Sequence, residues 1–153
     1  MKKEIRYIEL KSGFSDNGPA WIGEVTFSKS GSTIYFNKMA LKKLKTSGLG
    51  SNHFDIETGD EYWISGVKKN GLDRHLAGGG KVLIDEDIVS DYLGMVSFDS
   101  LDKSKYEIIK IEKSIDKSRF DKLENESGIS SVTNQENYHK WYWDNNRRKL
   151  VKE

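Results

Sequence analysis

The pattern that most constrains the fold is a β-hairpin in residues 20–36. Residues 20–27 alternate between two faces, as a strand does. Residues 28–32 are rich in turn formers, and Gly31 among them can adopt a positive φ. Residues 33–36 then return as a second strand of β-forming residues. The chain is therefore expected to build a mainly β fold.

The other segments with strand character are short and are separated by turns. We expect strands at residues 3–11, 54–56, 61–67, 72–76, 81–84 and 105–113. Turns are expected at residues 57–60 and at the Asn70-Gly71 pair, which suits two positive φ values. The predicted fold class is mainly β (α+β), a small twisted sheet or partly open barrel over residues 1–93. Residues 94–153 are expected to form a C-terminal extension, with a strand and helices, that packs on it.

Helices are expected at four places. Asn37 can cap a helix that Gly48 ends, although a strand around Met39 followed by a basic loop fits the same residues. Asp85 is expected to cap a helix over residues 86–93, and another helix begins at Ser118. The last helix is expected at residues 138–143, where aromatic side chains have helical spacing; a strand is the alternative.

Composition excludes several classes of function. The chain has 153 residues and no cysteine, which rules out disulfides, cysteine zinc sites and a cysteine nucleophile. No stretch approaches the roughly 20 apolar residues that cross a bilayer. The N-terminus does not resemble a secretory signal, so we expect a cytoplasmic protein with no membrane association.

The charge balance argues against a chain dominated by nucleic-acid binding. The formal net charge is +1, with 12 basic and 9 acidic residues in residues 1–80 and 13 basic and 15 acidic in residues 81–153. This asymmetry is much weaker than the basic stripe of a nucleic-acid binder. Aromatic side chains nevertheless lie near basic ones, as in small barrels that bind single strands or peptides. The predicted ligand-binding residues are Lys38, Tyr62, Lys68, Lys69, Arg74 and His75.

The chemistry-bearing residues do not form a convincing catalytic set. His53 and Asp55 can lie on one side of a strand, and Arg74 and His75 follow a turn, so these four are the candidates for a small enzyme. No two histidines are three or four residues apart, and we predict no metal site and no cofactor.

Three stretches together resemble a group of small bacterial proteins of uncharacterised function. They are the Gly-Pro-Ala, Ile-Gly and Val-Thr-Phe-Ser-Lys-Ser-Gly strings in residues 18–31, the Asp-Ile-Glu-Thr-Gly and Glu-Tyr-Trp-Ile-Ser-Gly strings in residues 55–66, and Ile-Asp-Glu-Asp at residues 84–87. Some members are named after deoxyxylulose-phosphate synthase, a thiamine-diphosphate enzyme far larger than this chain. The resemblance covers residues 4–93 and implies a module boundary there, with no catalytic residues to carry over.

These observations favour a non-enzymatic binding module with a nucleic-acid or protein partner. The first alternative is a small enzyme or binding protein for a phosphorylated or nucleotide-like ligand. The second is a protein-interaction factor in defence or immunity that uses the aromatic segment at residues 138–143.

Overall fold

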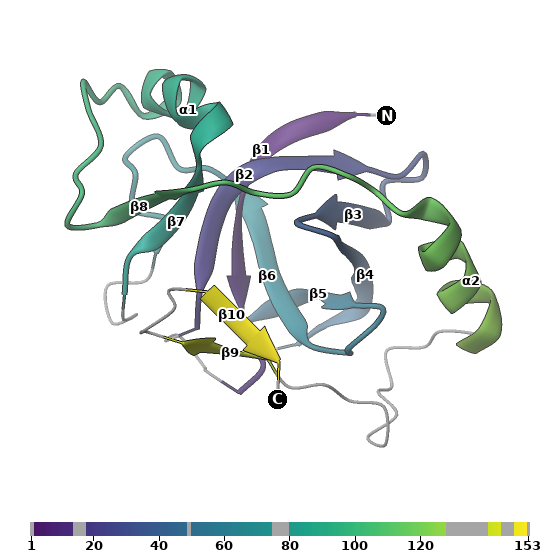
Figure 1. Ribbon diagram of the computed structural model, residues 1–153. Coiled ribbons are helices and arrows are strands. Elements are labelled where there is room, and N and C mark those ends of the chain that lie inside the picture. Colours follow the sequence, from purple (N-terminus) through teal and green to yellow (C-terminus); the bar gives the residue numbers. More distant parts are fainter. Residues whose placement is uncertain are drawn as a thin grey trace.

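The computed structural model describes residues 2–13, 18–48, 50–74, 80–127, 141–144 and 149–152. Its elements are arranged along the chain as Figure 1 shows. They are β1 (Lys3–Leu10), β2 (Ala20–Phe27), β3 (Thr33–Phe36), β4 (Met39–Gly48), β5 (Ser51–Asp55), β6 (Glu61–Gly66), β7 (Val82–Asp85), the 3₁₀ helix η1 (Glu86–Ile88), α1 (Val89–Val96), β8 (Tyr106–Ile109), α2 (Lys117–Ser127), β9 (Trp141–Asp144) and β10 (Lys149–Lys152).

The first six strands form a closed antiparallel barrel. Each pairs with the next along the chain, and β1 also pairs with β6, which closes the circle. Ile8 of β1 faces Trp21 of β2 on one side and Ile64 of β6 on the other. The predicted mainly β class is confirmed, and the hairpin of β2 and β3 has the predicted bounds.

Strand alternation places one set of side chains inside the barrel. Ile8 and Leu10 of β1 pack there with Trp21, Tyr62 and Ile64, all of them buried. Because directly paired residues share a face, the intervening residues of β1 and β2 lie on the outer face of the barrel. The interior is therefore a packed core.

A second core lies outside the barrel wall. β7 pairs in parallel with the first part of β2, and β8 pairs in parallel with β7, so the sheet continues beyond the barrel. Tyr7 of β1 and Ile22 of β2 are buried there in one cluster with Ile84 of β7 and Tyr92 of α1. The predicted cap is confirmed, because the Asp85 side chain accepts the backbone N–H of Asp87 and starts η1.

The segment between β8 and α2 runs across the barrel from the α1 side to the opposite side (Figure 1). On its way it inserts Ile111 into the core. Gly23 of β2 makes room for this contact, since a Cβ there would lie 2.8 Å from Cε1 of Phe36 and 3.2 Å from Cδ1 of Ile111. Phe120 of α2 then packs against Tyr35 of β3. Ile111 and Phe120 thus attach this segment to the barrel at two points.

The predicted helix at residues 37–49 is wrong. Asn37 and Lys38 adopt positive φ values of 48° and 65°, which makes a two-residue turn, and the chain returns at once as β4. Alternation then turns the buried Leu41 side chain toward the core. The alternative, a strand around Met39, is the correct one.

Two other predictions at the level of elements fail. Residues 141–144 form strand β9, which pairs with β10. For these residues the predicted aromatic helix is wrong and the strand alternative is correct. Residues 138–140 lie outside the described residues. The predicted strand at residues 72–76 does not form at residues 72–74. There the Asp73 side chain accepts the backbone N–H of Lys68, a loop contact in place of strand pairing. Residues 75–76 lie outside the described residues. Among the described residues, no helix is both long enough and apolar enough to span a membrane.

Candidate functional site

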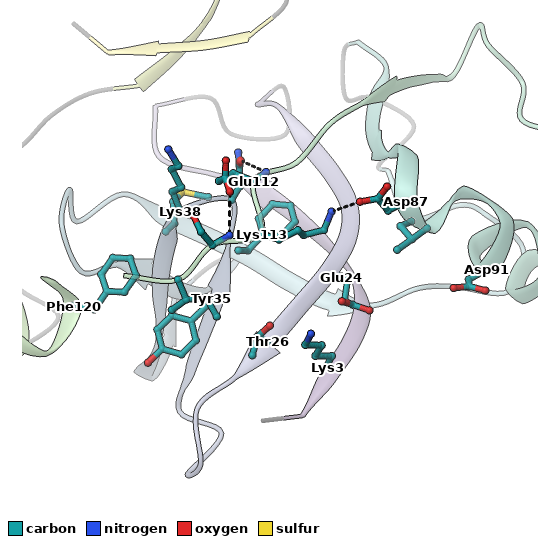
Figure 2. A pocket seen from close by; sticks show the side chains of 16 residues that line it. Lys3, Glu24, Thr26, Tyr35, Lys38, Asp87, Asp91, Glu112, Lys113 and Phe120 are labelled. Carbon is teal, nitrogen blue, oxygen red and sulfur yellow. Dashed lines mark hydrogen bonds and ion pairs between the residues drawn. The ribbon is translucent and has the colours of Figure 1, made fainter. Parts of the chain in front are cut away.

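A groove of about 270 Å³ lies on the outer face of the barrel (Figure 2). Its floor is the outer face of β1 and β2. Lys3 pairs with Thr26 across these strands, and Ile5 pairs with Glu24, so Lys3, Thr26 and Glu24 share one face. These three side chains all line the groove.

The two walls come from segments later in the chain. One wall is η1 with the start of α1, where Asp87 and Asp91 are four residues apart and both line the groove. The other wall is the segment at residues 112–115, which follows β8. Asn37 anchors this segment, because its side-chain oxygen accepts the backbone N–H of Glu112 at 3.4 Å. One wall of the groove therefore depends on residues after 94, which fold back over the barrel.

Lys113 joins the two walls. Its ammonium group forms ion pairs with the carboxylates of Asp85 and Asp87, the latter at 3.1 Å. Burial lowers the pKa of Lys113, but the hydrogen bonds to the two carboxylates outweigh burial, so its pKa lies above the usual value. Lys113 is therefore charged and already paired.

One end of the groove is aromatic. The rings of Tyr35 and Phe120 stack with centroids 5.8 Å apart and an angle of 27° between their planes. The guanidinium group of Arg119 lies 4.8 Å from the centre of the Phe120 ring and pairs with Glu57 at 2.7 Å. Figure 2 shows Tyr35 and Phe120 together, away from Asp91.

Carboxylates outnumber ammonium groups along the groove. The lining contains four carboxylates, on Glu24, Asp87, Asp91 and Glu112, and three ammonium groups, on Lys3, Lys38 and Lys113. The sequence prediction included only Lys38 of these residues. The other charged residues of the groove come from β1, β2, η1, α1 and the segment after β8, and the sequence prediction missed them. Only the four-residue spacing of Asp87 and Asp91 could have indicated in the sequence that two of them share a face.

The predicted ligand-binding residues do not share one surface. Lys38 is exposed in the β3–β4 turn and lines the groove. Tyr62 is buried inside the barrel beside Trp21, and its hydroxyl donates to the sulfur of Met39 at 3.3 Å. Lys68 and Lys69 are exposed on the connection after β6, and His75 lies outside the described residues.

Arg74 belongs to a polar cluster beside the second core. It donates to the backbone oxygen of Gly18 at 2.6 Å and also bonds the hydroxyl of Tyr7. Tyr7 donates in turn to Glu9, which pairs with Lys11 at 2.7 Å. Burial and the bond to Glu9 raise the pKa of Tyr7, so its hydroxyl stays neutral. These contacts attach the ends of two loops to β1.

The candidate catalytic residues have local roles. Nδ1 of His53 lies 2.8 Å from the side-chain oxygen of Asn52, and Asp55 accepts the backbone N–H of Glu57 at 2.8 Å. Burial, with Lys43 and Arg6 nearby, lowers the pKa of His53 to about 4, and burial raises that of Asp55 to about 6. No group of three metal-ligating side chains occurs among the described residues.

Comparison with known proteins adds no relative. No family model, curated protein or solved structure matches this chain. The resemblance in residues 4–93 and the function therefore stay predictions, and the groove is the main evidence for the function.

Proposed function

We propose that this chain is a non-enzymatic binding module that holds a segment of a protein partner in the groove beside β2. The observation that carries this proposal is the lining of the groove, which combines an aromatic end with an excess of carboxylates. Protein segments offer both apolar and charged side chains, and they dock in grooves of this mixed character.

The charges of the groove favour a protein over a nucleic acid. Binding of a phosphate backbone depends on several free lysine or arginine side chains. Here Lys113 is paired with two aspartates, and Lys38 and Lys3 share the groove with four carboxylates. A phosphate chain in this groove would meet net repulsion.

The size of the groove favours binding of a few side chains over binding of a cofactor. Sites for small molecules typically measure about 300–1,000 Å³. The groove, at about 270 Å³, is below that range. His53 and Asp55, the main candidates for catalysis, are engaged within β5 and its turn, and neither lines the groove.

The test is selection from a random peptide library displayed on phage. We expect the selected peptides to bind the wild-type protein and the Ser90→Trp control, which alters an exposed position of α1 outside the groove. Thr26→Trp places a large side chain on the groove floor, so binding should be lost while the melting transition stays cooperative. Amide resonances of Thr26, Tyr35 and Asp91 should shift when a selected peptide is titrated.

The same protein is tested against a fluorescent thymidine oligonucleotide at low salt. We expect no change in anisotropy. Binding of the oligonucleotide that weakens steeply with salt would contradict the proposal and support the nucleic-acid alternative. Selected peptides that bind Thr26→Trp as well as they bind the wild type would also contradict it.

A further inference from the structure

We propose that the groove recognises a basic side chain of its partner, with the charged group between Glu24 and Asp91. An apolar neighbour of that side chain then lies toward Tyr35 and Phe120. This inference rests on the proposed function and adds the chemistry of the ligand: a short protein segment that combines an arginine with an aromatic or aliphatic residue.

The first step is that Glu24 and Asp91 are free to accept a cation. Glu24 rises from β2 on the floor, and Asp91 projects from the first turn of α1. Neither carboxylate makes an ion pair or hydrogen bond with any residue in the described part of the chain. Figure 2 shows both on the same side of the groove, away from the aromatic end.

The second step is that this wall already holds a cation between carboxylates. The Lys113 ammonium group lies between Asp85 and Asp87, and Asp87 is four residues before Asp91. A ligand cation at Asp91 and Glu24 would repeat this arrangement one step further along the groove. Asp87 itself is satisfied by Lys113, which leaves Asp91 and Glu24 as the acceptors for a ligand.

The third step is that the other end of the groove suits an apolar side chain. Ile115, Tyr35 and Phe120 line it and belong to one hydrophobic cluster. The groove therefore has an acidic end and an apolar end, which fixes the direction in which an amphipathic segment can bind. Charge complementarity then identifies the occupant, since an acidic segment would bring like charges to the Glu24 end.

Arginine fits the acidic end better than lysine does. A guanidinium group has five N–H donors in a planar fork and can bond two carboxylates from different elements at once. Lys3 of β1 lines the groove beside Glu24, and its positive charge opposes that of a basic ligand. Its removal should therefore strengthen the binding of a basic ligand.

The probes are two blocked tetrapeptides, acetyl-Phe-Gly-Arg-Gly-amide and the same peptide with citrulline, a neutral isostere, in place of arginine. Amide resonances of Glu24, Thr26 and Asp91 are followed as each peptide is added to the full chain. We expect saturable shifts with the arginine peptide and an affinity about tenfold weaker with citrulline, since the charge-assisted bonds contribute about 1.4 kcal/mol.

Variants identify the site. Glu24→Gln with Asp91→Asn should reduce the affinity for the arginine peptide to that for the citrulline peptide. Lys3→Gln should increase it. Glu86→Gln is the matched control, because Glu86 is exposed on η1 but does not line the groove, and it should leave the affinity unchanged.

The outcomes separate this inference from the proposed function. Equal affinities for the two tetrapeptides, or shifts with the arginine peptide that survive the double substitution, would overturn the basic-side-chain inference. If peptides from the phage library still bind the groove in that case, the proposed function stands. If neither the tetrapeptides nor any library peptide shifts the groove resonances, both fail.

Discussion

The ammonium group of Lys113 pairs with the carboxylate of Asp85, a side chain with no exposed surface. One oxygen of Asp85 accepts the backbone N–H of Asp87 at 3.1 Å and so caps η1, while the other is the oxygen that Lys113 contacts. A single buried carboxylate thus fixes the start of one groove wall and the position of the other. The end of β7 and the segment after β8 are connected through this residue.

Replacement of Lys113 by methionine should destabilise the protein. The substitution leaves the buried carboxylate of Asp85 without its counter-charge, which costs about 1–3 kcal/mol. This exceeds the roughly 0–1 kcal/mol of an exposed pair, because only the lysine side of the pair reaches solvent. The free energy of unfolding in urea measures the loss.

Lys110→Met is the matched control, since Lys110 is exposed on the same segment. It should change the free energy of unfolding by no more than about 0.5 kcal/mol. Asp85→Asn keeps the cap but removes the buried charge, so Lys113→Met should cost much less when Asp85→Asn is also present. Equal losses in the two backgrounds would show that the pair does not stabilise the fold.

Asp55 should make the folded state more stable in acid. Burial raises its pKa from 3.8 to about 6, so the folded state binds more protons than the unfolded state between these pH values. Its contribution to the free energy of unfolding is therefore fully present below pH 3.8 and lost as the pH rises through about 6. A shift of roughly two pKa units corresponds to about 3 kcal/mol at most. Asp55→Asn keeps an oxygen acceptor for the Glu57 N–H and should be at least as stable as the wild type at pH 7.

His53 should act in the opposite direction. Its pKa is about 4 in the folded state against 6.5 in a model peptide, so the unfolded state binds more protons in this window. Its contribution is present above pH 6.5 and lost as the pH falls through about 4. The free energy of unfolding of the wild type minus that of Asp55→Asn should therefore fall as the pH rises. The same difference for His53→Gln should rise with pH. Slopes of the same sign would contradict both assignments; urea unfolding at constant ionic strength measures them.

Much of the barrel is predictable because its strands have one dominant period. Residues 20–27 and 33–36 alternate and are separated by a turn, and their bounds agree with β2 and β3. Residues 39–44 are different, because Met39 and Leu41 fit a strand while Leu41 and Leu44 fit a helix. The turn at Asn37 and Lys38 decides between the two, and positive φ at a lysine has no sequence signature.

The groove is not predictable in the same way. Glu24 and Asp91 are far apart in sequence, and only the parallel pairing of β7 with β2 brings α1 over the barrel wall. Tyr62 shows the converse error, since an aromatic residue near Lys68 suggests a binding surface but strand alternation places it inside the barrel. Local patterns therefore identify strands, while the site depends on which strands become neighbours.

Gly23→Ala should destabilise the core. The added Cβ would lie 2.8 Å from Cε1 of Phe36 and 3.2 Å from Cδ1 of Ile111, so both side chains must move. Overpacking of this kind costs about 1–3 kcal/mol. Gly94→Ala is the control: Gly94 lies within α1, and an added Cβ would meet nothing within 4 Å beyond the adjacent backbone of its own helix. This variant should therefore gain about 0.5–1 kcal/mol from helix propensity. Thermal melts of the two variants should shift in opposite directions.

Lys38→Gly should stabilise the β3–β4 turn. Lys38 has a φ of 65°, a region that a side chain makes unfavourable, and glycine after Asn37 would complete the Asn-Gly pair that two-residue hairpins prefer. We expect the free energy of unfolding to rise by about 0.5–1 kcal/mol.

Lys29→Gly is the matched control, because Lys29 lies in the β2–β3 turn and is not among the residues with positive φ. There glycine only increases the freedom of the unfolded chain, so stability should fall. Losses in both variants would mean that the backbone at Lys38 is not strained, and the turn would then have to be explained by the packing of Phe36 and Met39, which pair on either side of it.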